Sequence, residues 1–261
     1  MTKIALALAR PQPLPFALPA RSLRVVAAAA AAAALAVLVY AGAARTTLFA
    51  VERIEVSGAP PDVAREIRAA VGPFAGTSLV RLDEEEVVAR IKALPSVRAV
   101  EYDRAFPSTL RLVVRAERPV AVVRAGEGAW LVSDRARVIR AVEMESAPRV
   151  PRIRSEGGGT PDPGQTIADP ELRVALETVA ALPAEFPARV VSARVEEGAP
   201  VLVLASGGEV RLGSAESVAL KLAAAARVLA ALSGDERAVL AYVDVSVPAR
   251  AVAALESQVE S

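Results

Sequence analysis

The stretch "RAFPSTLRLVVRAERPVAVV", residues 104–123, contains the boundary that decides the fold. Its middle alternates as a strand does, with Leu110, Leu112 and Val114 on one face. The triplet Glu117-Arg118-Pro119 ends that strand, because proline has no N–H to donate to a sheet. An apolar run resumes immediately. We therefore predict that one sheet ends here and a second begins, in another domain, with an ordinary β-turn within one domain as the alternative.

The composition excludes several kinds of chemistry. The 261 residues are 53% hydrophobic, which is enough for one or two globular domains. The chain has no Cys and no His. Disulfides, thiolate and imidazole metal sites, and Ser-His-Asp or Cys-His catalysis are therefore excluded. The net charge of +1 gives no reason to expect nucleic acid as a ligand.

Before the boundary, the pattern predicts a strand, two helices and two further strands. The expected strands are 51–56, 97–102 and 109–115. Pro60-Pro61-Asp62 starts the first helix, and Asp83 caps the second, with Glu86 three residues later as in a capping box. Phe106-Pro107-Ser108 turns between the last two strands. A three-stranded sheet with both helices on one face would bury both apolar stripes in a compact α+β module.

After the boundary, short strands separated by turns predict a mixed, mostly antiparallel β domain with helices. The expected strands are 120–124, 130–133, 137–140, 190–195, 201–204, 209–212 and 242–252. Residues 154–166 form a loop rich in Gly and Pro, and Asp169 or Asp162 caps a helix that runs to about Leu182. A second amphipathic helix lies within 213–234, with Lys221 outside its buried stripe.

An uncharged stretch, residues 25–44, precedes both modules. As a helix it would be ~30 Å long, the thickness of a bilayer's hydrocarbon core, although 12 of its 20 residues are Ala. Arg21 and Arg24 before it place the N-terminus in the cytoplasm by the positive-inside rule. We predict a cytoplasmic tail at 1–24 and a transmembrane helix at 25–44. A cleaved signal peptide and a buried soluble helix are the alternatives.

In order, these segments resemble the FtsQ/DivIB family of bacterial cell-division proteins. The motifs that carry the resemblance are Leu94-Pro95, Arg104-Ala105-Phe106-Pro107, Glu117-Arg118-Pro119, Leu212-Gly213, Lys221-Leu222, Tyr242-Val243-Asp244 and Pro248. The third motif departs from the family pattern, which has a spacer before the proline. The resemblance implies a POTRA-like domain at 48–118, an FtsQ/DivIB-type β domain at 119–253 and a C-terminal tail at 254–261.

The same resemblance implies a function. It indicates a non-enzymatic, single-pass protein of the cell membrane at the division septum, with its bulk outside the cytoplasm. Such a protein bridges divisome proteins, here FtsB/DivIC-like and FtsL-like subunits, and helps to regulate septal peptidoglycan synthesis. No cofactor, metal, nucleic acid or small-molecule substrate is expected.

The alternative comes from another class: an anchored or secreted cell-envelope hydrolase that works with carboxylates. An acid pair in a cleft of the second domain would favour the hydrolase, and a bare strand edge would favour the scaffold. We find no catalytic constellation in the sequence. The acidic run Glu84-Glu85-Glu86 is typical of a helix start, where it complements the helix dipole.

The resemblance places partner binding on the terminal strand, Tyr242–Val252. A last strand is often a sheet edge to which a partner strand can add, although a central, purely structural strand is the alternative. Alternation puts Tyr242, Asp244 and Ser246 on one face and Val243, Val245 and Val247 on the core face, and Pro248 limits the pairing. The candidate partner-binding residues are Tyr242, Asp244, Ser246, Val247, Pro248, Ala249 and Ala251. The candidate junction and turn residues are Arg104, Phe106, Pro107, Glu117, Arg118 and Pro119.

Overall fold

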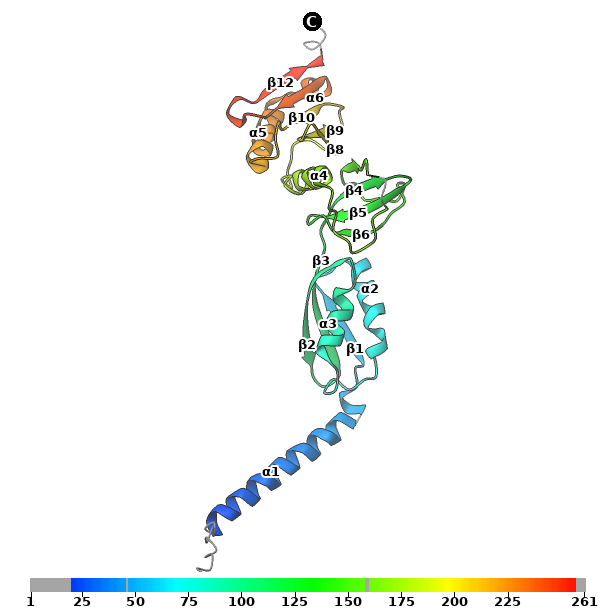
Figure 1. Ribbon diagram of the computed structural model, residues 1–261, viewed down its shortest axis with the longest axis vertical. Helices are drawn as coiled ribbons and strands as arrows, with labels where there is room; N and C mark the ends of the chain where they lie inside the picture. The colour runs from blue at the N-terminus through cyan, green and yellow to red at the C-terminus, as the bar shows by residue number, and fades with distance from the viewer. Residues whose placement is uncertain (1–19, 46, 158–159, 257–261) are drawn as a thin grey trace, which may run out of the picture.

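The computed structural model describes residues 20–45, 47–157 and 160–256, and shows one long helix followed by two sheets in series (Figure 1). The predicted tail residues 1–19 and the last residues, 257–261, lie outside this description. Helix α1 lies at one end of the molecule, and strand β12 (Val252–Leu255) lies at the other (Figure 1).

Helix α1 (Ala20–Arg45) covers the whole uncharged stretch. Its large apolar side chains that the structure describes are exposed: Val25, Val26, Leu35, Val37, Leu38 and Tyr40. Among the residues that the structure describes, no helix combines the length and the apolar character needed to cross a membrane. A helix at 25–44 is therefore confirmed, and a transmembrane span there is not. Most of that stretch is alanine, which adds one methyl group of apolar surface per residue.

The first sheet has three strands in the order β1-β3-β2, with β1 parallel and β2 antiparallel to β3. Its elements are β1 (Arg53–Ser57), α2 (Pro61–Val71), α3 (Glu84–Lys92), β2 (Val97–Ala105) and β3 (Thr109–Ala116), after a short 3-10 turn η1 (Thr47–Phe49). Ile67 of α2, Ile91 of α3, and Leu110 and Leu112 of β3 share one core. Both helices therefore cover the same face, and the predicted β-α-α-β-β module is confirmed.

The start of α3 shows how the local sequence sets an element boundary. Asp83 is the N-cap, and its Oδ1 accepts a hydrogen bond from the backbone N–H of Glu85 at 2.9 Å. Glu86 forms an ion pair with Arg90 one turn later, rather than the reciprocal bond of a capping box. A capping box forms instead at Ser233, where α6 (Gly234–Ala238) begins.

The second sheet has nine strands in the order β12-β11-β10-β9-β8-β7-β4-β5-β6. Its strands are β4 (Pro119–Ala125), β5 (Gly128–Ser133), β6 (Val138–Ala141), β7 (Arg152–Arg154), β8 (Val190–Glu196), β9 (Ala199–Leu204), β10 (Glu209–Arg211), β11 (Leu240–Asp244) and β12 (Val252–Leu255). Helices α4 (Pro170–Ala180) and α5 (Val218–Ala231) share one core with it, so they cover one face. On the other face, a small apolar cluster forms between β4–β6 and residues 142–150.

Strand β7 joins the two halves of this sheet. It pairs in parallel with β4 at three register positions and with β8 at two, Arg152 with Ser192 and Ile153 with Ala193. Helix α4 packs across this seam through Leu172 and Ala175. Sequence periodicity does not predict β7, because three residues after a proline are too short to show a period.

The C-terminal part of the chain corrects two predictions. The single strand expected at Tyr242–Val252 is a hairpin, formed by β11, the 3-10 turn η3 (Pro248–Arg250) and β12. Pro248 starts the helical turn because its fixed φ suits that position. Ala254 and Leu255, predicted to lie in the tail, are therefore strand residues.

Lys221 was expected outside the buried stripe of its helix, but only 4% of the residue is exposed. Its ammonium group donates hydrogen bonds to the carbonyl oxygen and the hydroxyl of Ser214, at 3.1 and 2.7 Å. The stem of the side chain is thus buried while the charged end keeps polar partners. The helical period predicts the direction in which this side chain points. It cannot predict that the loop containing Ser214 covers the side chain.

Candidate partner interface

Strand β11 carries the first predicted partner-binding residues, and it is not a sheet edge. It pairs in parallel with β10 and antiparallel with β12, so both of its sides are occupied. Val243 and Val245 are fully buried, as alternation predicts. Val247 is 54% exposed rather than part of the core, because the strand has already ended at Asp244. The prediction that Tyr242 and Asp244 lie on an edge strand is wrong.

The remaining predicted residues form the loop of this hairpin. The N–H of Ser246 donates to Oδ1 of Asp244 at 2.8 Å, which turns the chain away from β11. Gly213 lies directly against Ser246, where any side chain at position 213 would collide with it, so glycine fits this close approach. Ala249 is exposed at the surface, and Ala251 packs partly against the main core.

The edge of the sheet is β12. Within the described part of the chain, it pairs on one side with β11, and its other side has no strand. Val252 is 56% exposed, while Ala253, the register partner of Val243, packs against the main core. Among the described residues, the edge of the sheet therefore lies one strand further along the chain than the predicted one. The sequence signal for β12 is the short apolar run after Pro248, and the predicted strand 242–252 includes only its beginning.

A charged network surrounds Tyr242 on the helix-free side of the sheet. Arg211 lies over the tyrosine ring, with its guanidinium carbon 4.4 Å from the ring centroid. Glu209 accepts hydrogen bonds from Arg194 at 2.5 Å and from Arg211 at 2.9 Å. Partial burial favours the neutral carboxyl, but the two guanidinium groups outweigh it and lower the pKa of Glu209. This network holds the arginine against the tyrosine next to the hairpin.

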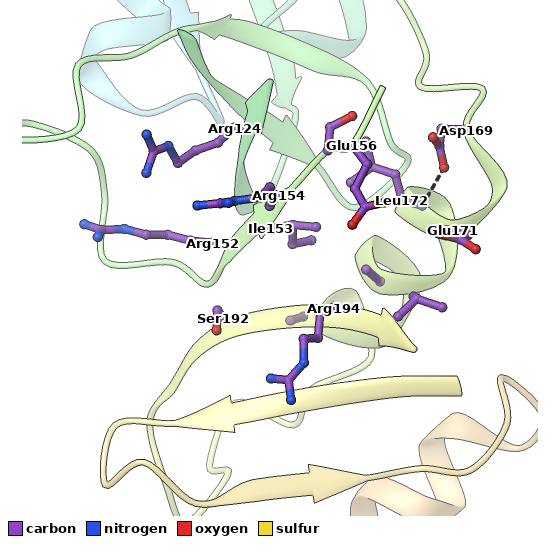
Figure 2. Close-up of a pocket in the computed structure, with 14 residues that line it drawn as sticks. Arg124, Arg152, Ile153, Arg154, Glu156, Asp169, Glu171, Leu172, Ser192 and Arg194 are labelled. Carbon is purple, nitrogen blue, oxygen red and sulfur yellow. Dashed lines mark hydrogen bonds between the residues drawn. The ribbon is translucent and has the colours of Figure 1, made fainter. Parts of the chain in front are cut away.

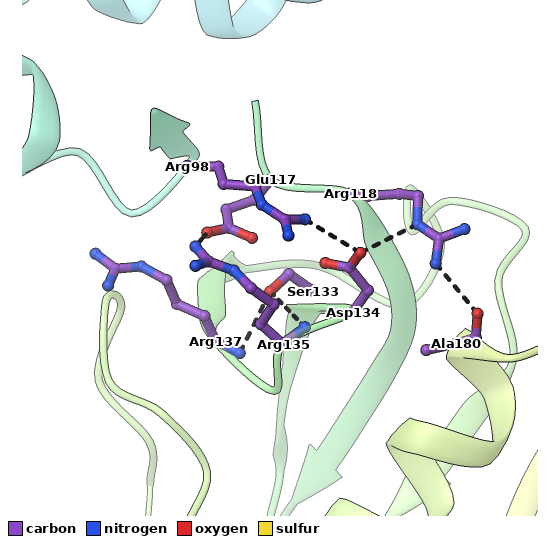
Figure 3. Close-up of polar contacts among 8 residues, drawn as sticks. All are labelled: Arg98, Glu117, Arg118, Ser133, Asp134, Arg135, Arg137 and Ala180. Carbon is purple, nitrogen blue, oxygen red and sulfur yellow. Dashed lines mark hydrogen bonds and ion pairs between the residues drawn. The ribbon is translucent and has the colours of Figure 1, made fainter. Parts of the chain in front are cut away.

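The junction residues lie between the two sheets, and polar contacts surround them (Figure 3). Glu117 continues the pairing of the first sheet, since its N–H donates to the carbonyl of Ser96 at 2.8 Å. Arg98 of β2 contacts Asp134 of the second unit at 3.4 Å. Arg118 contacts the same carboxylate at 3.4 Å and donates to the carbonyl of Ala180, at the end of α4, at 3.1 Å. Pro119 is the first residue of β4.

Glu117 is buried rather than part of a solvated turn. Its side chain is fully inaccessible, and Oε1 accepts a close hydrogen bond from Arg135 (Figure 3). This hydrogen bond raises the pKa of Arg135. The other carboxylate oxygen of Glu117, Oε2, has no hydrogen-bond partner among the described residues. The charged pair at 117–118 therefore ties the two sheets together.

The turn residues lie at the opposite end of the first sheet, next to α1 (Figure 1). Arg104 donates to the hydroxyl of Tyr102 at 2.8 Å and to the carbonyl of Leu82 at 2.9 Å. The hydrogen bond with Tyr102 raises the pKa of Arg104. Phe106 is 58% exposed, forms a cis peptide bond with Pro107, and meets Phe49 edge to face at 5.8 Å.

The second unit also contains a cavity of about 430 Å³, which tests the hydrolase alternative (Figure 2). Three carboxylates line it, those of Glu156, Asp169 and Glu171. Asp169 caps α4 by accepting from the N–H of Leu172 at 2.9 Å, and Glu171 lies in the first turn of that helix. Two of the three acids therefore serve the helix start. The described residues contain no group of His, Cys, Asp or Glu that could hold a metal ion.

Comparison with known proteins identifies the class of both units. Residues 49–116 match the family "POTRA domain, FtsQ-type", and residues 121–246 match "Cell division protein FtsQ/DivIB, C-terminal". The chain is 35% identical to the cell division protein FtsQ of Streptomyces venezuelae over 190 residues, which cover 72% of this chain and 68% of that protein. It is 29% identical to FtsQ of Streptomyces bingchenggensis over 200 residues, which cover 76% and 73% of the two chains.

Among solved structures, the major extracytoplasmic domain of DivIB from Geobacillus stearothermophilus is similar at 16% identity, with a TM-score of 0.31. The match covers 45% of this chain and 98% of that domain. The two family matches cover both sheets, and the Streptomyces relatives belong to the same family. The chain is therefore a cell-division protein with an FtsQ-type POTRA domain and belongs to the FtsQ/DivIB family.

Proposed function

We propose that this protein is a non-enzymatic scaffold of the division septum that receives a partner strand at β12. The observation that carries the proposal is that β12 is the edge strand of the large sheet among the described residues, at the end of the molecule far from α1 (Figure 1). An edge strand offers backbone N–H and C=O groups to an added strand, and the flanking side chains select the partner. Septal peptidoglycan synthesis would be regulated through the proteins that assemble there.

The partners in this proposal are FtsB/DivIC-like and FtsL-like divisome subunits. A partner strand beside β12 would contact Val252 first and then the exposed hairpin loop that contains Val247 and Ala249. Tyr242 and Asp244 would act from one strand further in, where Arg211 holds the tyrosine ring. In this proposal, the predicted residues contact the partner beside the edge strand, and they do not form the edge strand themselves.

We also propose that α1 holds the protein at the cell membrane, with the two sheets outside the cytoplasm. Support comes from the uncovered apolar side chains of α1 and from Leu48 and Phe106, which are exposed beside it. In spheroplasts, added protease should degrade residues 45–261 and leave the N-terminal part. Mature protein that starts near Ala44 would contradict this proposal and favour a cleaved signal peptide.

The domain limits 48–118 and 119–253 are part of the same proposal, extended by Ala254 and Leu255. Separate cores support the division, since one cluster contains Ile67 and Leu110 and another contains Leu176 and Leu222. The buried Glu117 and its hydrogen-bonded neighbours protect the junction. Limited proteolysis should therefore cut first in the loop at 154–166 and later at 116–119.

The decisive experiment changes the edge and a matched control. Val252→Glu places a charge beside the open side of β12, and Leu220→Glu places one on α5, where the original side chain is 58% exposed. Both variants should fold, because both sites are exposed. Binding to the FtsB/DivIC-like subunit should be lost in the first variant and kept in the second.

A folded Val252→Glu variant with wild-type affinity would show that β12 is not the site. In cells, depletion of the protein should give filamentous, undivided cells. The β12 variant should fail to restore division, while the α5 variant should restore it.

A further inference from the structure

The helix-free face of the large sheet carries a group of arginines far from β12. Arg124 of β4 is the register partner of Arg154 of β7, and Arg152 lies two residues before Arg154 on the same face. Figure 2 shows the three guanidinium groups extending to the same side, away from α4. All three side chains are exposed.

These arginines are not neutralised by the protein. Across the described residues, no hydrogen bond or ion pair involves the side chains of Arg124, Arg152 or Arg154. Their neighbours Arg194 and Arg211 differ, because both bind the carboxylate of Glu209. Like charges side by side on a sheet are unfavourable, so the fold gains nothing from this arrangement.

Two further arginines extend the charged surface. Arg149 and Arg189 line a second hollow of about 240 Å³ together with Arg152. Arg152 also lines the 430 Å³ cavity, so the two hollows adjoin at this residue. Neither Arg149 nor Arg189 has a side-chain hydrogen bond or ion pair with any described residue. The surface formed by Arg124, Arg149, Arg152, Arg154 and Arg189, the basic face, is therefore uncompensated.

We propose that the basic face binds an extended, acidic segment of a partner protein. Guanidinium groups bind carboxylates through paired, charge-assisted hydrogen bonds. Arg152 and Arg154 are two residues apart on one strand, which separates them by about 6.6 Å. An extended peptide presents every second side chain on one side with the same spacing. A segment with acidic residues at alternate positions therefore matches the basic face.

The surroundings favour a peptide over a uniformly charged polymer. Glu156, Asp169 and Glu171 line the other part of the 430 Å³ cavity and would repel a continuous run of phosphates (Figure 2). The buried side chains of Ile153 and Leu172 also line it, which gives an apolar side chain a place to pack. A peptide can present carboxylates and an apolar side chain next to each other, whereas a uniformly charged polymer cannot.

This site is independent of the strand addition proposed at β12. Strand β7 is the sixth strand from that edge in the order β12-β11-β10-β9-β8-β7. An acidic segment on the basic face would use side chains, whereas a partner at β12 would use the backbone. The inference thus goes beyond the proposed function and does not require it.

The test measures binding of the full chain in detergent to a fluorescent peptide in which glutamate and threonine alternate. The double variant Arg152→Gln/Arg154→Gln should weaken binding by about tenfold or more, since hydrogen bonds to charged groups are among the stronger ones. The matched control, Arg65→Gln/Arg68→Gln on α2, removes the same charge from exposed positions. It should bind as the wild type does, and salt should weaken binding in both.

Equal affinity of the wild type and the double variant would overturn the proposal, and so would an equal loss in the α2 control. Inorganic polyphosphate that binds to this face more tightly than the peptide would overturn the choice of ligand. The Val252→Glu variant should keep its affinity for the peptide. Failure at β12 and failure at the basic face are therefore distinguishable.

Discussion

Two groups of arginines, one on the helix-free face of each sheet, differ in whether they have acidic partners. On the three-stranded sheet, Arg111 lies between Glu55 at 3.4 Å and Asp103 at 3.3 Å. On the nine-stranded sheet, Arg124, Arg152 and Arg154 lie together without an acidic partner among the described residues. The protein itself therefore balances the charge of Arg111. It does not balance the three arginines of the larger sheet, which is why we propose that they bind a molecule of opposite charge.

The largest expected effect tests whether the two sheets are independent units. Leu110→Ala and Leu202→Ala each remove a fully buried side chain, from β3 and from β9. Each should cost about 2–5 kcal/mol of unfolding free energy through lost burial and a residual cavity. Differential scanning calorimetry should show one transition lowered by each variant. If each variant lowered both transitions equally, the two sheets would be one cooperative unit.

A smaller effect is expected where the large sheet does balance its charges. Glu209→Gln should cost about 1 kcal/mol at pH 7, because both Arg194 and Arg211 lose an ionic partner. The pKa of Glu209 lies below its ordinary value of 4.5, so its stabilising contribution is complete above that value. The contribution should disappear as the pH falls through the lowered pKa.

Urea unfolding of wild type and Glu209→Gln at several pH values checks this expectation. The difference in unfolding free energy should shrink below pH 4.5, the ordinary value for this group. A difference that stays constant into acid would mean that packing of the side chain, rather than its charge, is responsible.

The smallest effect sharpens the comparison most, because the two faces should respond with opposite signs. Arg111→Gln removes two exposed ion pairs and should destabilise the protein by about 0.3–0.5 kcal/mol. Arg154→Gln relieves repulsion from Arg124 and should stabilise it by about 0.2–0.5 kcal/mol. Urea unfolding at low salt measures both, and high salt should reduce both. The same sign for both variants would remove the distinction between the faces.

Much of the fold follows from local patterns in the sequence. The alternation of Leu110, Leu112 and Val114 predicts β3 and its buried face, and Asp83 and Asp169 predict the starts of α3 and α4. These succeed because strand alternation and helix capping depend on residues close together in the chain. The family resemblance, carried by ordered motifs, is confirmed by the comparisons.

The site was less predictable, because strand neighbours are set by distant parts of the chain. Pro248 separates the strand of Tyr242 from the strand of Val252, but which of the two is covered and which lies at an edge depends on the pairing of β11 with the distant strand β10. The basic face has the same origin. Arg124 and Arg154 become neighbours through the parallel pairing of β4 with β7, a strand too short for any periodicity.

The short connection between the two sheets fixes the distance between the two ends of the molecule. Glu117 and Arg118 are the whole covalent link between β3 and β4, and two residues reach at most about 7 Å. Arg118 is held at both Asp134 and Ala180, so the link contains no slack. The distance from α1 to β12 is therefore set by two sheets in series rather than by a flexible linker. In the proposed function, a partner strand would therefore have to reach β12 at that fixed distance from α1.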